Sequence, residues 1–199
     1  MTNEQHKGQR GFSLLEVMIV TTILVVIVGG IFQVLSAGLN AYNSGTVLVD
    51  VQGLARRTME GMIREVQGAG LSTVSPTPPL PGQTGTSTIT FQQATGYSGG
   101  SVTWGDTITV AFAYVDGESD NGADDNGNHL VDEGVVTLTI DDGEGGITNE
   151  TIGYWVKEGG LQFNLSGALL TITLEVERYE PRGELMQALL STTVKIKNQ

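Results

Sequence analysis

The sequence contains no cysteine and only two histidines, His6 and His129, among its 199 residues. Without cysteine the chain has no disulfide, no thiolate metal site, no cysteine nucleophile and no C-x-x-C-H haem attachment. The two histidines do not stand with a serine and an acid in any recognisable hydrolase motif. We therefore do not expect an enzyme.

Basic side chains are also scarce. The net charge is −12, and no Lys or Arg occurs between Arg64 and Lys157, a stretch that holds thirteen Asp and Glu residues. A nucleic-acid-binding protein needs a basic surface, so this charge balance argues against a nucleic-acid partner. The acidic middle of the chain is instead expected to attract cations.

The chain does have a long hydrophobic run after Gly11, in the segment GFSLLEVMIVTTILVVIVGGIF that ends at Phe32. A helix of about 20 apolar residues spans the roughly 30 Å hydrocarbon core of a bilayer. A secretory signal peptide has a shorter apolar region, of about 7–15 residues, with its cleavage site behind it. Here a polar start with Lys7 and Arg10 ends at a glycine that precedes the run, which predicts a membrane-spanning helix with a cytoplasmic N-terminus.

Glu16 is the one charged residue in this run, and a simple membrane anchor does not explain it. A carboxylate that lies deep and unpaired in a membrane costs roughly 2.5 kcal/mol or more, so it usually marks a partner. The segment Gly11-Phe12-Ser13-Leu14-Leu15-Glu16 follows a short basic leader and begins an apolar helix. This arrangement resembles the class III signal of type IV prepilins and type II secretion pseudopilins.

The resemblance implies a processing site and an assembly role. A prepilin peptidase would cleave between Gly11 and Phe12 and methylate the new amine of Phe12. Glu16 would then be the assembly carboxylate, which neutralises the amine of a neighbouring subunit; such a pair is strong only when it closes in an apolar setting.

The same resemblance implies partners and a location. The partners would be other pilins or pseudopilins through the N-terminal helix, the prepilin peptidase and the inner-membrane assembly platform. The protein would first be a single-pass inner-membrane protein with a cytoplasmic N-terminus. It would later belong to a pilus or to a periplasmic filament at the cell surface.

The helical pattern continues beyond the membrane-spanning run. Apolar residues recur at three- and four-residue steps, and no proline occurs before Pro76. We expect one helix from Phe12 to about Gln67, with its second half packed on a globular domain. The residues of its apolar face are Val47, Val51, Leu54, Ala55, Met59, Met62 and Val66.

Glycines interrupt this helix at Gly30, Gly38, Gly45, Gly53, Gly61 and Gly68. Each glycine costs about 1 kcal/mol relative to alanine inside a helix. Two explanations stay open: small residues let neighbouring helices approach closely, or they soften the helix so that it bends on assembly. We favour softening near Gly29 and Gly30.

The second half of the chain has the pattern of strands, because β-branched and aromatic residues alternate in seven segments. Turn residues separate several of these segments, including Glu158-Gly159-Gly160. Short connections predict an antiparallel meander that lies on the helix, an α+β fold of the type IV pilin kind. The predicted strands are residues 87–91, 107–115, 135–140, 151–157, 161–165, 168–177 and 189–197.

Three further segments resemble PilW-type minor pilins, and the last two also resemble J-type pseudopilins: Met62–Gly70, Tyr154–Leu161 and Val194–Asn198. The favoured function is a structural minor pilin that takes part in the assembly and initiation of a type IV pilus. A minor pseudopilin of type II secretion and a calcium-dependent adhesive module displayed on a pilus are the alternatives. The expected organisation is a cleaved leader (1–11), a membrane-spanning and filament-core helix (12–32), its amphipathic continuation (33–70) and an antiparallel β domain (71–199).

An acidic loop, residues 116–134, separates two of the predicted strands with the sequence DGESDNGADDNGNHLVDEG. Asp124, Asn126, Asn128 and Asp132 stand at relative positions 1, 3, 5 and 9, which resembles the ladder of oxygen ligands in calcium loops. An EF-hand has glycine at position 6, where this chain has His129, and glutamate at position 12, where it has Val135. The loop therefore predicts a calcium site without flanking helices.

The expected calcium ligands are Asp120, Asp124, Asn126, Asn128, the Leu130 carbonyl, Asp132 and Glu133. Asp116, Glu118 and Asp120 either complete this site or form a second, weaker one. His129 is expected to be an exposed bystander rather than a zinc ligand, because no cysteine or nearby second histidine supports zinc. The alternative is a flexible, solvated loop that binds no metal.

Overall fold

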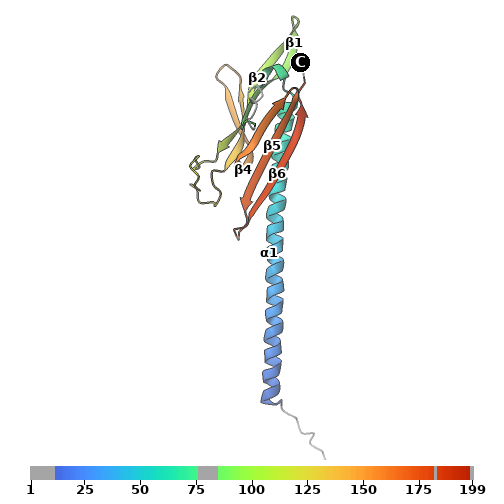
Figure 1. The fold of residues 1–199 in the computed structure, drawn as a ribbon, viewed down its shortest axis with the longest axis vertical. Coiled ribbons are helices and arrows are strands. Elements are labelled where there is room, and N and C mark those ends of the chain that lie inside the picture. Colours follow the sequence, from blue (N-terminus) through green and yellow to red (C-terminus); the bar gives the residue numbers. More distant parts are fainter. Residues whose placement is uncertain (1–11, 76–84, 182, 198–199) are drawn as a thin grey trace, which may run out of the picture. The chain divides into compact units, whose positions relative to one another are not determined.

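The predicted long helix is present as α1 (Leu14–Gln67) in the computed structural model, which describes residues 12–75, 85–181 and 183–197. After it come a short 3-10 helix, η1 (Leu71–Thr73), and six strands (Figure 1). The strands are β1 (Thr88–Ser98), β2 (Ser101–Tyr114), β3 (Gly134–Asp141), β4 (Ile147–Ser166), β5 (Leu169–Tyr179) and β6 (Leu185–Lys195). The chain divides into two compact units, Met1–Ser44 and Gly45–Gln199.

The six strands form one sheet in sequence order, and each strand pairs antiparallel with the next. This confirms the antiparallel meander. β1 and β2 are longer than predicted because they pair as far as Ser98 and Ser101, across a two-residue turn at Gly99 and Gly100. Both glycines have positive φ, +62° and +85°, which the tight turn of a hairpin requires.

One predicted turn is wrong. Residues 151–157 and 161–165 are parts of the single strand β4, which continues through Glu158-Gly159-Gly160 with a shift of register against β5 between Val156 and Leu161. A Cβ atom at Gly160 would lie 2.8 Å from the backbone oxygen of Glu175, so only glycine fits there. A glycine pair serves a bulge as well as a turn, and the local sequence does not distinguish the two.

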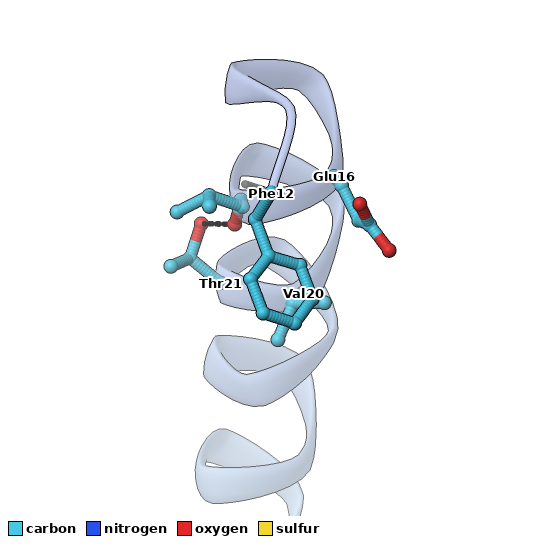
Figure 2. A pocket seen from close by; sticks show the side chains of 5 residues that line it. Phe12, Glu16, Val20 and Thr21 are labelled. Carbon is cyan, nitrogen blue, oxygen red and sulfur yellow. Dashed lines mark hydrogen bonds between the residues drawn. The ribbon is translucent and has the colours of Figure 1, made fainter. Parts of the chain in front are cut away.

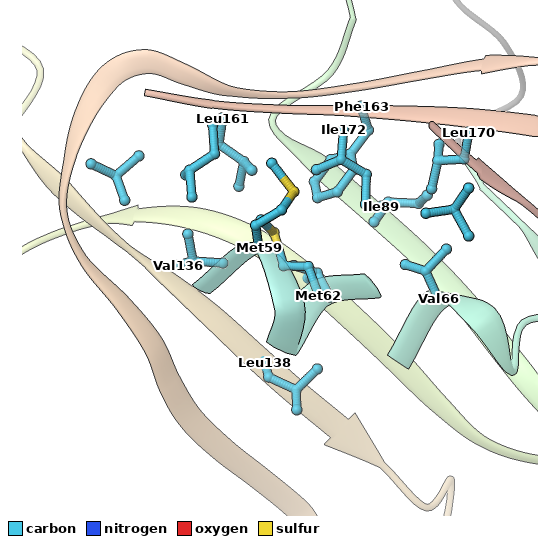
Figure 3. Close-up of a cluster of buried hydrophobic side chains, with 14 of the residues drawn as sticks. Met59, Met62, Val66, Ile89, Val136, Leu138, Leu161, Phe163, Leu170 and Ile172 are labelled. Atoms are coloured by element: carbon cyan, nitrogen blue, oxygen red, sulfur yellow. The ribbon is translucent and has the colours of Figure 1, made fainter. Parts of the chain in front are cut away.

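The core lies between the last five turns of α1 and one face of the sheet. Met59, Met62 and Val66 point from the helix toward side chains of several strands, among them Phe163 and Ile172 (Figure 3). These helix residues stand at three- and four-residue steps, so one stripe of the helix is buried and the rest faces solvent. The predicted packing of the helix on the sheet is therefore confirmed.

A close approach between helix and sheet occurs at Thr58. Its Oγ1 donates a hydrogen bond of 3.2 Å to the backbone oxygen of Ile152 in β4. A Cβ atom at the next residue, Gly153, would lie 2.4 Å from Thr58 Cγ2. The helix reaches the sheet here because position 153 has no side chain.

Candidate functional site

Ser13 begins helix α1 by capping it. Its Oγ accepts the backbone N–H of Glu16 at 3.2 Å, which satisfies one of the free N–H groups of the first turn. Ser-x-x-Glu is the sequence of a capping box, in which the glutamate can also bond back to the N–H of the cap residue. Glu16 therefore has a local structural explanation beside the assembly role predicted for it.

Phe12 and Glu16 line a shallow groove on the first turns of the helix, together with Val17, Val20 and Thr21. Figure 2 shows the Phe12 ring lying along the helix toward Val20, whereas the Glu16 carboxylate extends outward from the helix. Phe12 is 81% exposed, and Glu16 is exposed too. Both side chains are thus available to a neighbouring molecule.

The apolar side chains after Glu16 find no burial in their own unit of the chain. From Val17 to Leu39, every large hydrophobic residue is more than half exposed. The hydroxyls of Thr21 and Thr22 donate to backbone oxygens one turn earlier, at 3.0 and 2.8 Å. The segment is long and apolar enough, by length and composition, to cross a membrane. Its threonine hydroxyls are satisfied within the helix, so they would not need water there.

This segment also matches known sequences. Residues 6–32 match the family model of the prokaryotic N-terminal methylation motif. No curated protein and no solved structure matches the chain. The motif supports a type IV pilin-like or pseudopilin-like protein that is anchored in a membrane and associates with other pilins.

The motif covers the predicted processing site. Gly11, with the rest of the leader, lies outside the described residues; Phe12 is the first residue that the structure describes. Cleavage between Gly11 and Phe12, methylation of Phe12 and the assembly role of Glu16 stay predictions.

The acidic loop lies between β2 and β3 and is closed at its base by backbone pairing. The N–H of Val115 donates to the backbone oxygen of Glu133 at 3.3 Å, just before β3 begins. Leu130 is buried and its N–H donates to Asn128 Oδ1 at 2.8 Å. The loop is therefore folded on itself and anchored by an apolar residue.

Asp124 organises the centre of the loop. Its carboxylate accepts the backbone N–H groups of Gly127, Asn128 and His129 at 2.6, 3.1 and 2.7 Å. Desolvation raises the pKa of Asp124, but these N–H groups, that of His129 first, outweigh it and bring the pKa below its ordinary value. Asp124 is thereby kept charged at the first position of the predicted ladder.

His129 has a positive φ of +74°. Calcium loops of the EF-hand type place glycine at this sixth position because the chain turns sharply there. Histidine is one of the residues that tolerate the left-handed region. At this one position the backbone therefore adopts the left-handed conformation that glycine favours, although glycine is absent.

Glu133 is the most deeply buried acid of the loop, with 1% of its surface exposed. Its Oε1 accepts the side-chain amides of Asn126, at 2.9 Å, and Asn128. Its Oε2 is buried and accepts no hydrogen bond from the described residues, and the same is true of Glu118 Oε2. An unsatisfied buried acceptor costs about 1–3 kcal/mol, and more when the group is charged.

A second acidic cluster forms at the edge of the loop. Oxygen atoms of Asp120, Asp132 and Glu158 lie within 4.8 Å of one another. Asp132 is buried, and its carboxylate accepts the N–H groups of Asn121 and Gly122 at 3.2 and 2.8 Å. Desolvation, followed by the charges of Asp120, Glu158 and Asp132, raises the pKa of the nearby Tyr114.

The structure therefore divides the predicted ligands into two groups. Asp124, Asn126, Asn128 and Glu133 lie together with Glu118, whereas Asp120 and Asp132 lie with Glu158. The sequence pattern missed Glu158 because it belongs to β4, 26 positions after Asp132, and only the pairing of β3 with β4 brings it to the loop.

Proposed function

We propose that this protein is a minor pilin that helps to assemble a type IV pilus. The observation that carries the proposal is the methylation motif at residues 6–32, joined to a helix whose apolar side chains are exposed. The leader Met1–Gly11 would be removed, the helix would hold the subunit in the inner membrane, and the same helix would then pack among other subunits. Pilin-type helices in a filament would cover the surface that the isolated chain leaves open.

Glu16 is the residue that would connect neighbouring subunits. Cleavage after Gly11 leaves a positive amine on Phe12, one turn from the Glu16 carboxylate in the chain's own groove. In an apolar filament core, each of these charges is unfavourable alone, and the two together are favourable when they meet. Because Glu16 extends outward from the helix (Figure 2), the amine of another subunit can approach it.

The processing step is tested by mass spectrometry of the protein in sheared surface filaments. We expect a chain that begins at Phe12 and carries one additional methyl group on its amine. Protein that retains Met1 and never enters the sheared fraction would contradict the proposal. A protein that copurifies with periplasmic secretion components, and not with surface filaments, would indicate a pseudopilus instead.

The role of Glu16 is separated from its capping role by three variants. Glu16→Gln keeps the capping box but removes the charge, Glu16→Asp keeps the charge, and Glu16→Ala removes both. We expect incorporation into sheared filaments to fall at least about tenfold in the Gln and Ala variants, because the Phe12 amine then has no counter-charge, and to be partly retained in the Asp variant. If Glu16→Gln is incorporated as well as the original protein, the carboxylate serves only to cap the helix.

A further inference from the structure

Two buried carboxylate oxygens in the acidic loop accept no hydrogen bond from the described residues. They belong to Glu118, which is half-buried, and to Glu133, which is almost wholly buried. Among the described residues, the salt bridge present is Lys157 with Glu175, so no described Lys or Arg pairs with either glutamate. A buried carboxylate is unfavourable in its charged form unless it is paired, so a positive partner from outside the protein would stabilise this arrangement.

Both glutamates meet at the same residue. Glu118 Oε1 accepts the backbone N–H of Asn126 at 2.8 Å, and Glu133 Oε1 accepts the side-chain amide of Asn126 at 2.9 Å. Glu118 lies just after β2 and Glu133 just before β3, so the loop folds back and brings together acids from its two ends. Both glutamates therefore lie beside Asn126, which makes their free oxygens candidates for one shared site.

Further oxygens are held around this site by the loop backbone. Asn126 Oδ1 accepts the N–H of Asn128 at 3.0 Å, and Asn128 Oδ1 accepts the N–H of Leu130 at 2.8 Å. An amide oxygen has two lone pairs, so each keeps one for a cation. Asp124 is fixed by three backbone N–H groups, that of Asn128 among them, and offers a further charged oxygen in the same loop.

We propose that the loop of residues 116–134 binds one calcium ion between Glu118 and Glu133, with Asp124, Asn126 and Asn128 as the other side-chain ligands. Calcium takes six to eight oxygen ligands in flexible geometry, and these five side chains with the Leu130 carbonyl and water supply that number. The unpartnered oxygen of Glu133, buried beneath the asparagines, distinguishes this site from an ordinary solvated acidic loop. The ion would join the end of β2 to the start of β3.

The proposal replaces part of the predicted ligand set. Asp132, at position 9 of the ladder, accepts backbone N–H groups on the other side of the loop and lies with Asp120 and Glu158. In the proposed site Glu118 replaces Asp132 as a ligand. Glu118 precedes Asp124, the first position of the ladder, in the sequence. The cluster of Asp120, Asp132 and Glu158 then serves as an internal comparison for the experiment.

The test uses the full chain purified in detergent and titrated with calcium chloride alone, followed by calorimetry and by thermal unfolding. We expect one ion per chain, a dissociation constant of about 10⁻⁴ M or tighter, and an unfolding temperature several degrees higher in calcium than in EDTA. Magnesium should bind more weakly, because it demands a compact octahedral shell. No heat and no shift at millimolar calcium would overturn the proposal, and so would an equal response to magnesium.

Matched variants locate the ion. Glu133→Gln and Glu118→Gln keep the shape of each side chain and remove one charge, so each should weaken calcium binding at least about tenfold. Glu144→Gln changes an exposed acid of the β3–β4 hairpin, and Glu158→Gln changes the second cluster; both should leave the affinity within about twofold. If Glu133→Gln does not fold, Glu118→Gln still tests the site. Binding that disappears in Glu158→Gln but survives in Glu118→Gln would place the ion elsewhere and overturn the assignment.

Discussion

Helix α1 carries apolar side chains along its whole length, but its two parts use them differently. From Val51 onward one stripe is buried against the sheet of the same chain, and Val51, Ala55 and Met62 have no exposed surface. From Val17 to Leu39 the apolar residues occur on all sides and are exposed. A helix that is apolar all round requires an apolar environment on all sides, which a lipid bilayer or a bundle of identical helices supplies.

The glycines of the helix do not follow this division, because the space at Gly61, in the packed part, is as open as at the glycines of the exposed part. The crowded glycine lies on the sheet. A Cβ atom would meet nothing within 4 Å at Gly30, Gly38 or Gly45, whereas Gly153, on the sheet beneath the second part, is in close contact with Thr58. On the sheet, the space left by the missing side chain of Gly153 is already occupied by Thr58 of the same chain. In the exposed part the missing side chains leave room for a neighbour from another chain, or they soften the helix.

The largest expected effect comes from truncating the packed part. Met62→Ala should lower the free energy of unfolding by about 2–5 kcal/mol, because it leaves a cavity between the helix and the sheet. Leu24→Ala is the matched control, since Leu24 belongs to the same helix but is 58% exposed. Denaturant unfolding of the full chain in detergent should show no more than about 0.5 kcal/mol for Leu24→Ala. An equal loss in both variants would mean that the two parts of the helix do not differ as described.

A smaller effect is expected from filling the two kinds of glycine position. Gly153→Ala should destabilise the protein by about 1–3 kcal/mol, because the new methyl group overlaps Thr58 and pushes the helix from the sheet. Gly38→Ala should instead stabilise the helix by up to about 1 kcal/mol, because alanine is the better helix former and the space is open. Thermal unfolding of the two variants measures this opposite sign.

Gly38→Ala also separates the two explanations of the helix glycines. If the glycines allow close packing between subunits, the variant is more stable but enters sheared filaments less well. If the glycines only soften the helix, incorporation into filaments depends on bending of the helix. Gly61→Ala, a second variant on the same helix, should then change stability and incorporation in the same way as Gly38→Ala, although Gly61 belongs to the unit that contains the sheet.

The helix and the sheet could be predicted because their signals are local. The three- and four-residue steps of Val51, Ala55 and Met62 indicate a buried stripe without any knowledge of the sheet. The alternation of β-branched residues likewise indicates strands. The turn assigned to Gly159 and Gly160 was wrong because a bulge and a turn demand the same residues, and only the pairing of β4 with β5 decides between them.

The metal ligands could be predicted only in part, for the same reason. Spacing along the chain finds side chains of one short ladder, such as Asp124, Asn126 and Asn128. It does not show that Glu118 folds back onto Asn126, nor that β4 carries Glu158 to Asp132. These contacts depend on how the loop folds at the end of the sheet, and the spacing of residues along the sequence does not predict that.

The smallest expected effect concerns charge at the surface of the sheet, where Lys157 donates a hydrogen bond of 3.1 Å to Glu175. The Lys157 side chain is 41% exposed, so solvent screens the pair, and Lys157→Gln should cost at most about 0.5 kcal/mol. The hydrogen bond to Glu175, followed by its charge, raises the pKa of Lys157 in the folded protein.

Because that folded pKa lies above the unfolded one, the contribution of the pair is complete below the ordinary lysine pKa and is lost as the pH rises through the raised value. The difference in unfolding free energy between the original protein and Lys157→Gln should therefore be constant at neutral pH and disappear in strong alkali. A loss comparable with that of Met62→Ala would show that charge, and not apolar burial, holds the sheet-packed unit together.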